Sequence, residues 1–144
     1  VPDGDYTIPT SGSAELKREG RDVTIVAYST MLLLALQAAE ELEKEGISAE
    51  VVDPRTLRPL DTELIIESVK KTNRAIVLES GAGFAGIGSG IGTIISEQAF
   101  DYLDAPVERV TGANAPTPYA KNLERAKIPS KERLVAAVKK VLAL

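Results

Sequence analysis

The feature that most constrains the fold is a passage from a buried strand into a capped helix. The mostly apolar stretch Ile47–Val52 has the composition of a strand covered on both faces, and the following Asp53-Pro54 step ends it, because proline cannot donate to a sheet ladder. Asp61 can then accept the free N–H groups at the start of a helix over residues 62–71. A strand, a rigid elbow and a helix in this order are typical of an α/β domain.

The same alternation continues along the chain. We predict strands over residues 23–28, 47–53, 74–79 and 106–111, helices over residues 31–45, 62–71, 89–102 and from 131 onward, and a long loop over residues 112–129. Ser29 or Thr30 can cap the first helix, Gly46 can end it, and Ser130 can cap the last. Strands alternating with helices predict a three-layer α/β/α sandwich around a mostly parallel sheet.

Residues 1–20 have a different character. Pro2, Pro9 and the small residues after Pro9 disfavour regular structure, so we predict a leading linker segment here and a single domain over residues 21–144. A start at Val1, without Met, suggests a domain cut from a longer chain. A length of 144 residues is enough for one domain with its own core, which must be aliphatic because only 4% of the residues are aromatic.

Charge and composition exclude several classes of function. A net charge of -4 argues against nucleic acid as a partner, which requires a basic surface. No apolar run approaches the roughly 20 residues of a membrane span, so we expect no membrane partner. The absence of Cys excludes disulfides and favours a cytoplasmic location.

The absence of His is the most restrictive fact about chemistry. Histidine is the usual general base near neutral pH, and imidazole or thiolate ligands hold most zinc ions. A chain with neither His nor Cys therefore has no Ser–His triad, no Cys–His pair and no ordinary zinc site. We predict no catalytic, cofactor-binding or metal-ligating residue, and we expect the isolated chain to be inactive.

Several stretches, in order along nearly the whole chain, carry a resemblance to a known family. They are Asp5–Pro9, Lys17–Gly20, Asp22–Tyr28, Ala49–Asp53, Arg55–Leu57, Pro59–Asp61, Glu67–Thr72, Asp101–Val107, Arg109–Gly112 and Pro116–Ala120. Together they resemble the carboxy-terminal, transketolase-like domain of the beta subunit in the decarboxylating component of 2-oxo acid dehydrogenase complexes, pyruvate or branched-chain.

The resemblance implies a fold and a role. It implies one antiparallel strand in the sheet, and a parent enzyme that decarboxylates a 2-oxo acid and transfers the acyl group to a lipoyl group. Thiamine diphosphate and Mg would belong to that parent enzyme, on the preceding domain or the alpha subunit, and not to this chain. The implied partners are the alpha subunit, the other beta subunit and the acyltransferase. In a eukaryote the location would be the mitochondrial matrix or a plastid.

The resemblance also implies a docking surface for the acyltransferase. In similar beta subunits, the acidic position matching Asp104 and the last residue, here Leu144, lie where the peripheral-subunit-binding domain of the acyltransferase docks. Leu142 would add apolar contact beside them. From the residues alone, Asp101 and Asp104 are two carboxylates at a helix end, for which the default interpretation is solvation.

The first helix suggests a second contact surface. It begins with six apolar residues, Met31–Leu36, whereas a surface helix shows only one apolar stripe. Either this end lies deep in the domain or it contacts another chain, and we favour contact through Met31, Leu32 and Leu33. We assign Gly83, Phe84 and Gly86 to the same predicted subunit interface.

Two alternative functions remain open. Residues 81–86 have the pattern G-x-G-x-x-G after a strand and before a helix, which can bind a dinucleotide. The acidic residue that would reach the ribose is missing after the next strand, so a tight turn is the favoured interpretation. The second alternative is a freestanding or engineered scaffold that keeps only the fold.

Overall fold

The computed structural model describes residue 4 and residues 12–143. The elements in this part of the chain are β1 (Glu15–Arg18), β2 (Val23–Ala27), α1 (Thr30–Lys44), β3 (Ala49–Asp53), α2 (Thr62–Thr72), β4 (Ala75–Ala82), α3 (Ile87–Gln98), the 3-10 helix η1 (Phe100–Tyr102), β5 (Glu108–Gly112), α4 (Lys121–Lys127) and α5 (Lys131–Val141).

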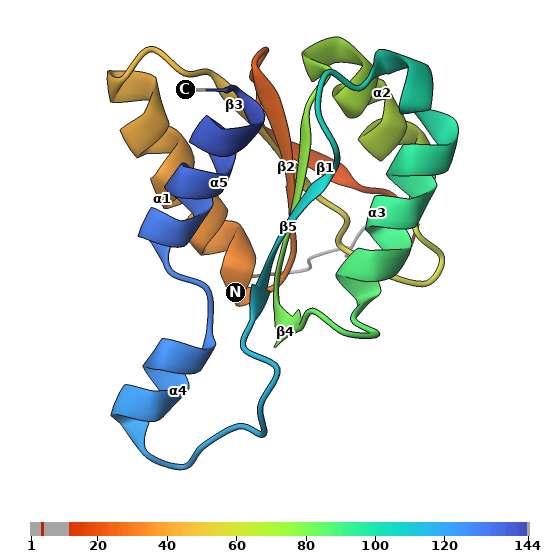
Figure 1. The fold of residues 1–144 in the computed structure, drawn as a ribbon. Helices are drawn as coiled ribbons and strands as arrows, with labels where there is room; N and C mark the ends of the chain where they lie inside the picture. The colour runs from red at the N-terminus through yellow and green to blue at the C-terminus, as the bar shows by residue number, and fades with distance from the viewer. Residues whose placement is uncertain (1–3, 5–11, 144) are drawn as a thin grey trace.

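The five strands form one sheet in the order β1-β3-β2-β4-β5 (Figure 1). The pairs β2–β3, β2–β4 and β4–β5 are parallel, and β1 runs antiparallel to β3 at the edge. Ile25 on β2 is in register with Val51 on one side and Ile76 on the other. The mostly parallel sheet and its one antiparallel strand are therefore confirmed.

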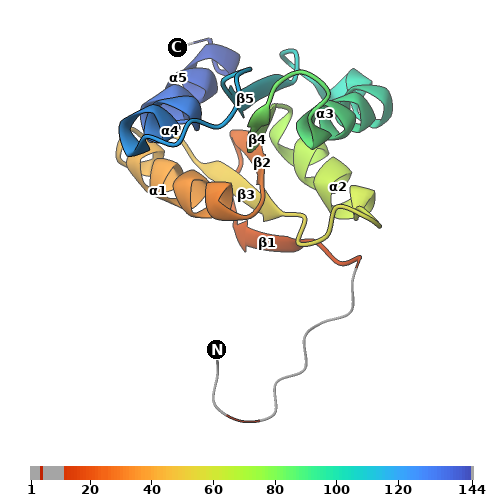
Figure 2. The ribbon, with the colours of Figure 1, turned by 90° about the horizontal axis from the view of Figure 1, so that it is seen from below.

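Helices cover both faces of this sheet (Figures 1 and 2). On one face, α1 and α5 bury an aliphatic cluster that includes Ile25, Leu42, Leu78 and Leu134. On the other face, α2 and α3 bury a second cluster around Val77, Ile65 and Ile95. Every residue of β2 is buried, as expected for a strand that is covered on both faces. The predicted three-layer sandwich is confirmed.

Most of the predicted helix ends are also present. Asp61 accepts a hydrogen bond from the N–H of Leu64 at 3.2 Å, and Ser130 Oγ accepts one from the N–H of Arg133 at 3.3 Å. Gly46 follows α1 with a φ of +82°, the left-handed conformation that glycine adopts without strain. Ser29 precedes α1, but its side chain makes no capping hydrogen bond, so that part of the prediction is wrong.

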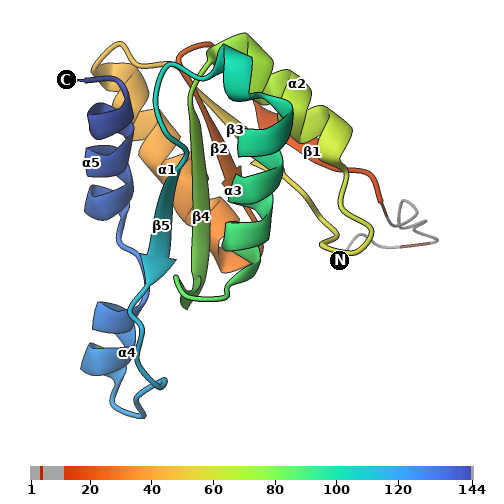
Figure 3. The ribbon, with the colours of Figure 1, turned by 45° about the vertical axis from the view of Figure 1, so that its right-hand side comes forward.

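Three other segments differ from the expectation. Residues 15–18, expected to lack regular structure, form β1; their weak apolar pattern is that of an edge strand with one face in solvent. Helix α3 ends at Gln98, and a separate 3-10 turn follows it. The predicted loop after β5 contains α4, which lies apart from the body of the domain (Figure 3).

A buried carboxylate joins strand β3, helix α2 and the turn between β1 and β2. Glu50 on β3 is only 1% exposed. Its Oε1 accepts a hydrogen bond from Ser68 Oγ, and its Oε2 accepts from the N–H of Gly20 and from the ammonium group of Lys71. Because both oxygens have partners, this charge is tolerated in the core and fixes α2 on the sheet.

Candidate functional site

The parallel strands end at one side of the sheet, here called the carboxyl edge, and begin at the opposite side, the amino edge. Three successive turns at the carboxyl edge each hold a non-glycine residue with positive φ: Ser29 at 56°, Arg55 at 57° and Ala85 at 56°. Such conformations cost free energy and are concentrated at functional positions. Ligand and partner sites of open α/β sheets also lie at this edge. We therefore take the carboxyl edge as the first candidate surface.

Two of these turns are joined through the buried carboxylate of Glu79 and the half-buried side chain of Tyr28. Tyr28 Oη donates to Glu79 Oε2 at 3.0 Å, and the N–H of Gly88 donates to the same oxygen at 3.1 Å. Glu79 is 2% exposed, and within the described residues its Oε1 has no hydrogen-bond partner. Burial of Tyr28 and the negative charge of Glu79 raise the pKa of the tyrosine to about 12. The pair links the start of α1 to the start of α3.

The same carboxylate explains the glycine-rich turn. A Cβ added at Gly86 would lie 2.7 Å from Glu79 Oε1, and one added at Gly88 would lie 2.5 Å from it. The glycines therefore let Glu79 approach the N-terminus of α3, where a dinucleotide-binding loop holds its phosphates. The protein's own carboxylate stands there and repels an anion, so the geometry supports the tight-turn interpretation over nucleotide binding.

Large apolar side chains are exposed around these turns. Phe84 is 83% exposed and Leu33 is 64% exposed, and Ile87 at the start of α3 is also exposed. Met31, which we predicted to contact another subunit, is instead buried in the core, and Leu32 packs partly against it. Of the predicted interface, Leu33 and Phe84 therefore carry the accessible apolar surface.

The two glycines assigned to the predicted interface have structural reasons of their own. A Cβ at Gly83 would lie 2.8 Å from Thr111 Oγ1, so glycine is needed for the approach of β5. The carbonyl oxygen of Gly83 accepts a hydrogen bond from Arg109 at 2.8 Å. Gly86 precedes α3 with an extended backbone. These contacts hold the turn that presents Phe84.

The second candidate surface is at the amino edge, around Asp104. Asp104 Oδ2 lies 3.0 Å from the guanidinium of Arg74, and the N–H of Asp104 donates to the carbonyl oxygen of Asn73. The side chain of Asn73 donates to the carbonyl oxygen of Tyr102, and the ammonium group of Lys70 lies 5.0 Å from the ring centroid of Tyr102. Asp104 is thus held in place rather than freely solvated.

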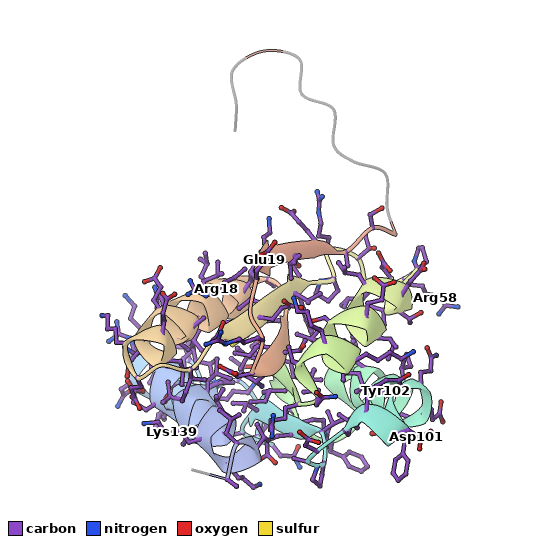
Figure 4. All side chains as sticks on the ribbon, turned by 90° about the horizontal axis from the view of Figure 1, so that it is seen from above. Arg18, Glu19, Arg58, Asp101, Tyr102 and Lys139 are labelled. Carbon is purple, nitrogen blue, oxygen red and sulfur yellow. The ribbon has the colours of Figure 1, made fainter. Side chains whose placement is uncertain are left out.

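Asp101 has surroundings different from those of Asp104, which pairs with Arg74. Asp101 lies in the 3-10 turn beside Tyr102, where its carboxylate is exposed (Figure 4). The Asp53–Arg55 elbow is also structural: the N–H of Arg55 donates to Asp53 Oδ1, and the guanidinium of Arg55 lies 3.6 Å from Glu15 on β1.

An apolar hollow lies beside Asp104. It has a volume of about 550 Å³ and is lined by Ser96, Phe100, Leu103, Asp104, Ala105, Pro106 and Val107. Phe100 is 74% exposed at its rim. Leu142, the second predicted docking residue, packs against the same core cluster as Ala105. Leu144, the third, lies outside the described residues.

Sequence reasoning missed three features of these surfaces. They are the Tyr28–Glu79 pair, the exposed Ile87 and the hollow beside Phe100. The only sequence signal for the Tyr28–Glu79 pair was a single acid at the end of an apolar strand.

Within the described residues, no three acidic side chains gather closely enough to hold a metal ion. In the same part of the chain, no helix has the length and apolarity needed to span a membrane.

The fold places the chain among three-layer α/β/α domains, with a mostly parallel sheet between two helical layers and a glycine-bearing turn after β4. The family described as "Transketolase, C-terminal domain" matches residues 12–134, and the chain belongs to this family. The chain is similar to beta subunits of the pyruvate dehydrogenase E1 component, in agreement with the resemblance that the sequence motifs carry.

Three relatives illustrate the match. The pyruvate dehydrogenase E1 component subunit beta of Rickettsia felis is 51% identical over 141 residues, which cover 98% of this chain and 43% of that protein. The mitochondrial subunit of Dictyostelium discoideum is 50% identical over 139 residues, covering 96% and 39%, respectively. The mitochondrial subunit of Saccharomyces cerevisiae is 49% identical over 142 residues, covering 97% and 38%. The chain therefore spans about two fifths of the length of these curated relatives.

A solved structure confirms the fold. A chain described as "Split gene transketolase, inactive beta4 tetramer" superposes with a TM-score of 0.77 at 33% identity. The alignment covers 100% of this chain and 45% of that one.

Proposed function

We propose that this chain is the non-catalytic assembly domain of a thiamine diphosphate-dependent 2-oxo acid dehydrogenase beta subunit. The whole enzyme would carry out the oxidative decarboxylation of a 2-oxo acid and pass the acyl group to a lipoyl group. We assign thiamine diphosphate and Mg to other parts of that enzyme. The match to about two fifths of each beta subunit supports this division of labour.

The observation that carries the proposal is the carboxyl edge, with exposed Leu33, Phe84 and Ile87 on and beside strained turns. Removing one such side chain from water contributes about 1.5–3 kcal/mol. In a two-fold contact each residue would count twice, once from each copy. Self-association of beta chains is also consistent with the relative described as a "beta4 tetramer".

The amino edge would serve a different partner, the peripheral-subunit-binding domain of the acyltransferase. Asp104 supplies a fixed negative charge beside an apolar hollow, and Leu142 lies on the core cluster nearby. A basic group of the partner would replace Arg74 as the ion-pair partner of Asp104, or share the Asp104 carboxylate with it. An apolar side chain of the partner would enter the hollow beside Phe100. Charge complementarity of this kind sets register and encounter rate more than affinity.

The test of self-association compares two charge substitutions. In sedimentation velocity of the 144-residue chain, Phe84→Glu at the carboxyl edge should raise the dissociation constant of the dimer about 10-fold or more, because it buries a charge in the contact. Phe100→Glu is the matched control, because Phe100 at the amino edge is 74% exposed against 83% for Phe84, and it should leave the constant unchanged. A wild-type chain that stays monomeric at millimolar concentration would refute the assembly role.

The test of docking reverses the roles of the two phenylalanine variants and adds Asp104→Arg. Calorimetric titration with the purified cognate peripheral-subunit-binding domain should show weaker binding for Asp104→Arg and Phe100→Glu, about 10-fold or more. Phe84→Glu should bind like the wild type. Equal affinity for all four proteins would rule out docking at this surface. A monomer that also binds no partner would favour the alternative of a freestanding scaffold.

A further inference from the structure

Residues 113–129, here called the arm, leave the body of the domain between β5 and α5 and carry α4 (Figures 1 and 3). None of residues 113–128 is buried. The arm is closed at its base, where the N–H of Ala113 donates to the carbonyl oxygen of Lys127 at 2.8 Å. Lys127 Nζ also donates to Thr117 Oγ1 across the arm. It is therefore a closed loop with its own internal contacts.

The helix in this arm lacks the usual sources of stability. It has seven residues, buries none of them, and its N-terminal flanking residue Ala120 has no side chain able to cap it. Isolated helices shorter than about 12 residues are marginal in water, and most helices in proteins depend on packing. Within the described chain α4 has no such packing. A second polypeptide is the natural source of it.

The arm presents apolar groups for that contact. Tyr119 is fully exposed, Leu123 is more than half exposed, and Ile128 is also at the surface. A hollow of about 290 Å³ next to them is lined by Ala113, Ala115, Pro116, Pro118, Leu123, Ala126 and Lys127. Prolines restrict the unbound arm and so lower the entropy lost on binding. Tyrosine is a frequent anchor in interfaces because a large ring is fixed by few rotatable bonds.

We propose that the arm clasps a second copy of this chain, with Tyr119 and Leu123 packing against the carboxyl edge of that copy. This proposal rests on the self-association proposed above and names the segment that holds the two copies together. The arm follows the carboxyl end of β5, so it lies at the same edge of the sheet as the start of α1 and the turn after β4 (Figure 3). Leu33 is in the first turn of α1, and Phe84 is in the turn after β4. A two-fold axis facing this edge would bring each arm onto the other copy.

Charge favours a copy of the same chain as the occupant. Lys121, Arg125 and Lys127 against Glu124 give the arm a net charge of +2. The remaining 14 basic and 20 acidic residues of the chain give a net charge of -6. A basic arm is therefore attracted to the acidic body of another copy, which steers the encounter.

The chain has no native cysteine, so single cysteines can report the contact directly. A Tyr119→Cys chain is mixed with an isotope-labelled Leu33→Cys chain and treated with a short bismaleimide. We expect covalent heterodimers, identified by mass. The matched control replaces the acceptor by Arg21→Cys, at the exposed amino edge, and should give none. Equal yields with both acceptors would overturn the proposed docking of the arm.

A second variant separates the arm from the rest of the interface. Tyr119→Ser combined with Leu123→Ser should raise the dissociation constant of the dimer about 10-fold or more. At a concentration where the wild type is monomeric, the melting temperature should not fall, since neither side chain is buried in its own chain. If Phe84→Glu abolishes association and the arm variant leaves it unchanged, the arm proposal fails while the assembly role stands. A monomeric wild-type chain would overturn both.

Discussion

The hydrogen bond between Tyr28 and Glu79 gives the sharpest prediction about stability. Tyr28→Phe removes only the hydroxyl that donates to a carboxylate 2% exposed, and leaves Glu79 with the N–H of Gly88 alone. A hydrogen bond to a charged group contributes about 1.5–3 kcal/mol. We therefore expect a loss of about 2 kcal/mol in the free energy of unfolding. For a domain of this size, that lowers the melting temperature by about 6 °C.

The measurement is denaturant unfolding followed by far-UV circular dichroism, because the chain contains no tryptophan. Tyr102→Phe is the matched control: Tyr102 is 47% exposed, and the cation–π contact from Lys70 needs only its ring. This control should change the free energy of unfolding by less than about 0.5 kcal/mol. A Tyr28→Phe protein as stable as the control would refute the view that this pair fixes the two turns.

The same pair predicts a pH dependence. The pKa of Tyr28 is raised to about 12 in the folded chain, whereas an unfolded tyrosine titrates near 10. Between these values the unfolded chain gives up a proton that the folded chain keeps, so stability falls as pH rises. The contribution of Tyr28 is complete below about pH 10 and is lost through about pH 12. Tyr28→Phe should remove this part of the alkaline decline, and an identical decline in both proteins would contradict it.

Four further substitutions test the local geometry by thermal unfolding. Asp61→Ala removes the cap on Leu64 and a 2.9 Å bond from the N–H of Ala14, and should cost about 1–2 kcal/mol; no change would mean that water replaces the cap. Gly88→Ala places a Cβ 2.5 Å from Glu79 Oε1 and should destabilise the fold by about 1–3 kcal/mol. Gly90→Ala is the control: a Cβ there would meet no atom within 4 Å, so alanine should stabilise the helix by up to about 1 kcal/mol. Ser29→Gly should stabilise by about 1 kcal/mol, since it relieves a φ of 56°; a loss would show that the serine side chain matters there.

The architecture could be predicted because its signals are local. Buried strands such as β2 are continuous apolar runs, Asp61 and Ser130 cap the helices that follow them, and Gly46 ends α1. The edge strand β1 was missed, since a strand with one solvated side leaves a weak pattern. Helix α4 was missed for a related reason: it buries nothing in its own chain, so its sequence shows no apolar stripe to read.

The candidate surfaces were less predictable, because they depend on distant residues meeting. The Tyr28–Glu79 contact spans 51 residues, and no spacing in the sequence indicates it. The apolar start of α1 was a real signal, yet its pattern did not show that Met31 faces the core while Leu33 faces solvent. Asp104 was predicted as a docking residue from resemblance, whereas its pairing with Arg74 emerges only from the fold.

The most direct measurement of the central proposal is an amide NMR dilution series on the 144-residue chain. If the chain associates through its carboxyl edge, the signals of Leu33, Phe84 and Tyr119 should shift together with concentration. Signals at the amino edge, such as those of Arg21 and Asp104, should stay constant until the peripheral-subunit-binding domain is added. Concentration-dependent shifts confined to the amino edge, or none at millimolar concentration, would contradict the account.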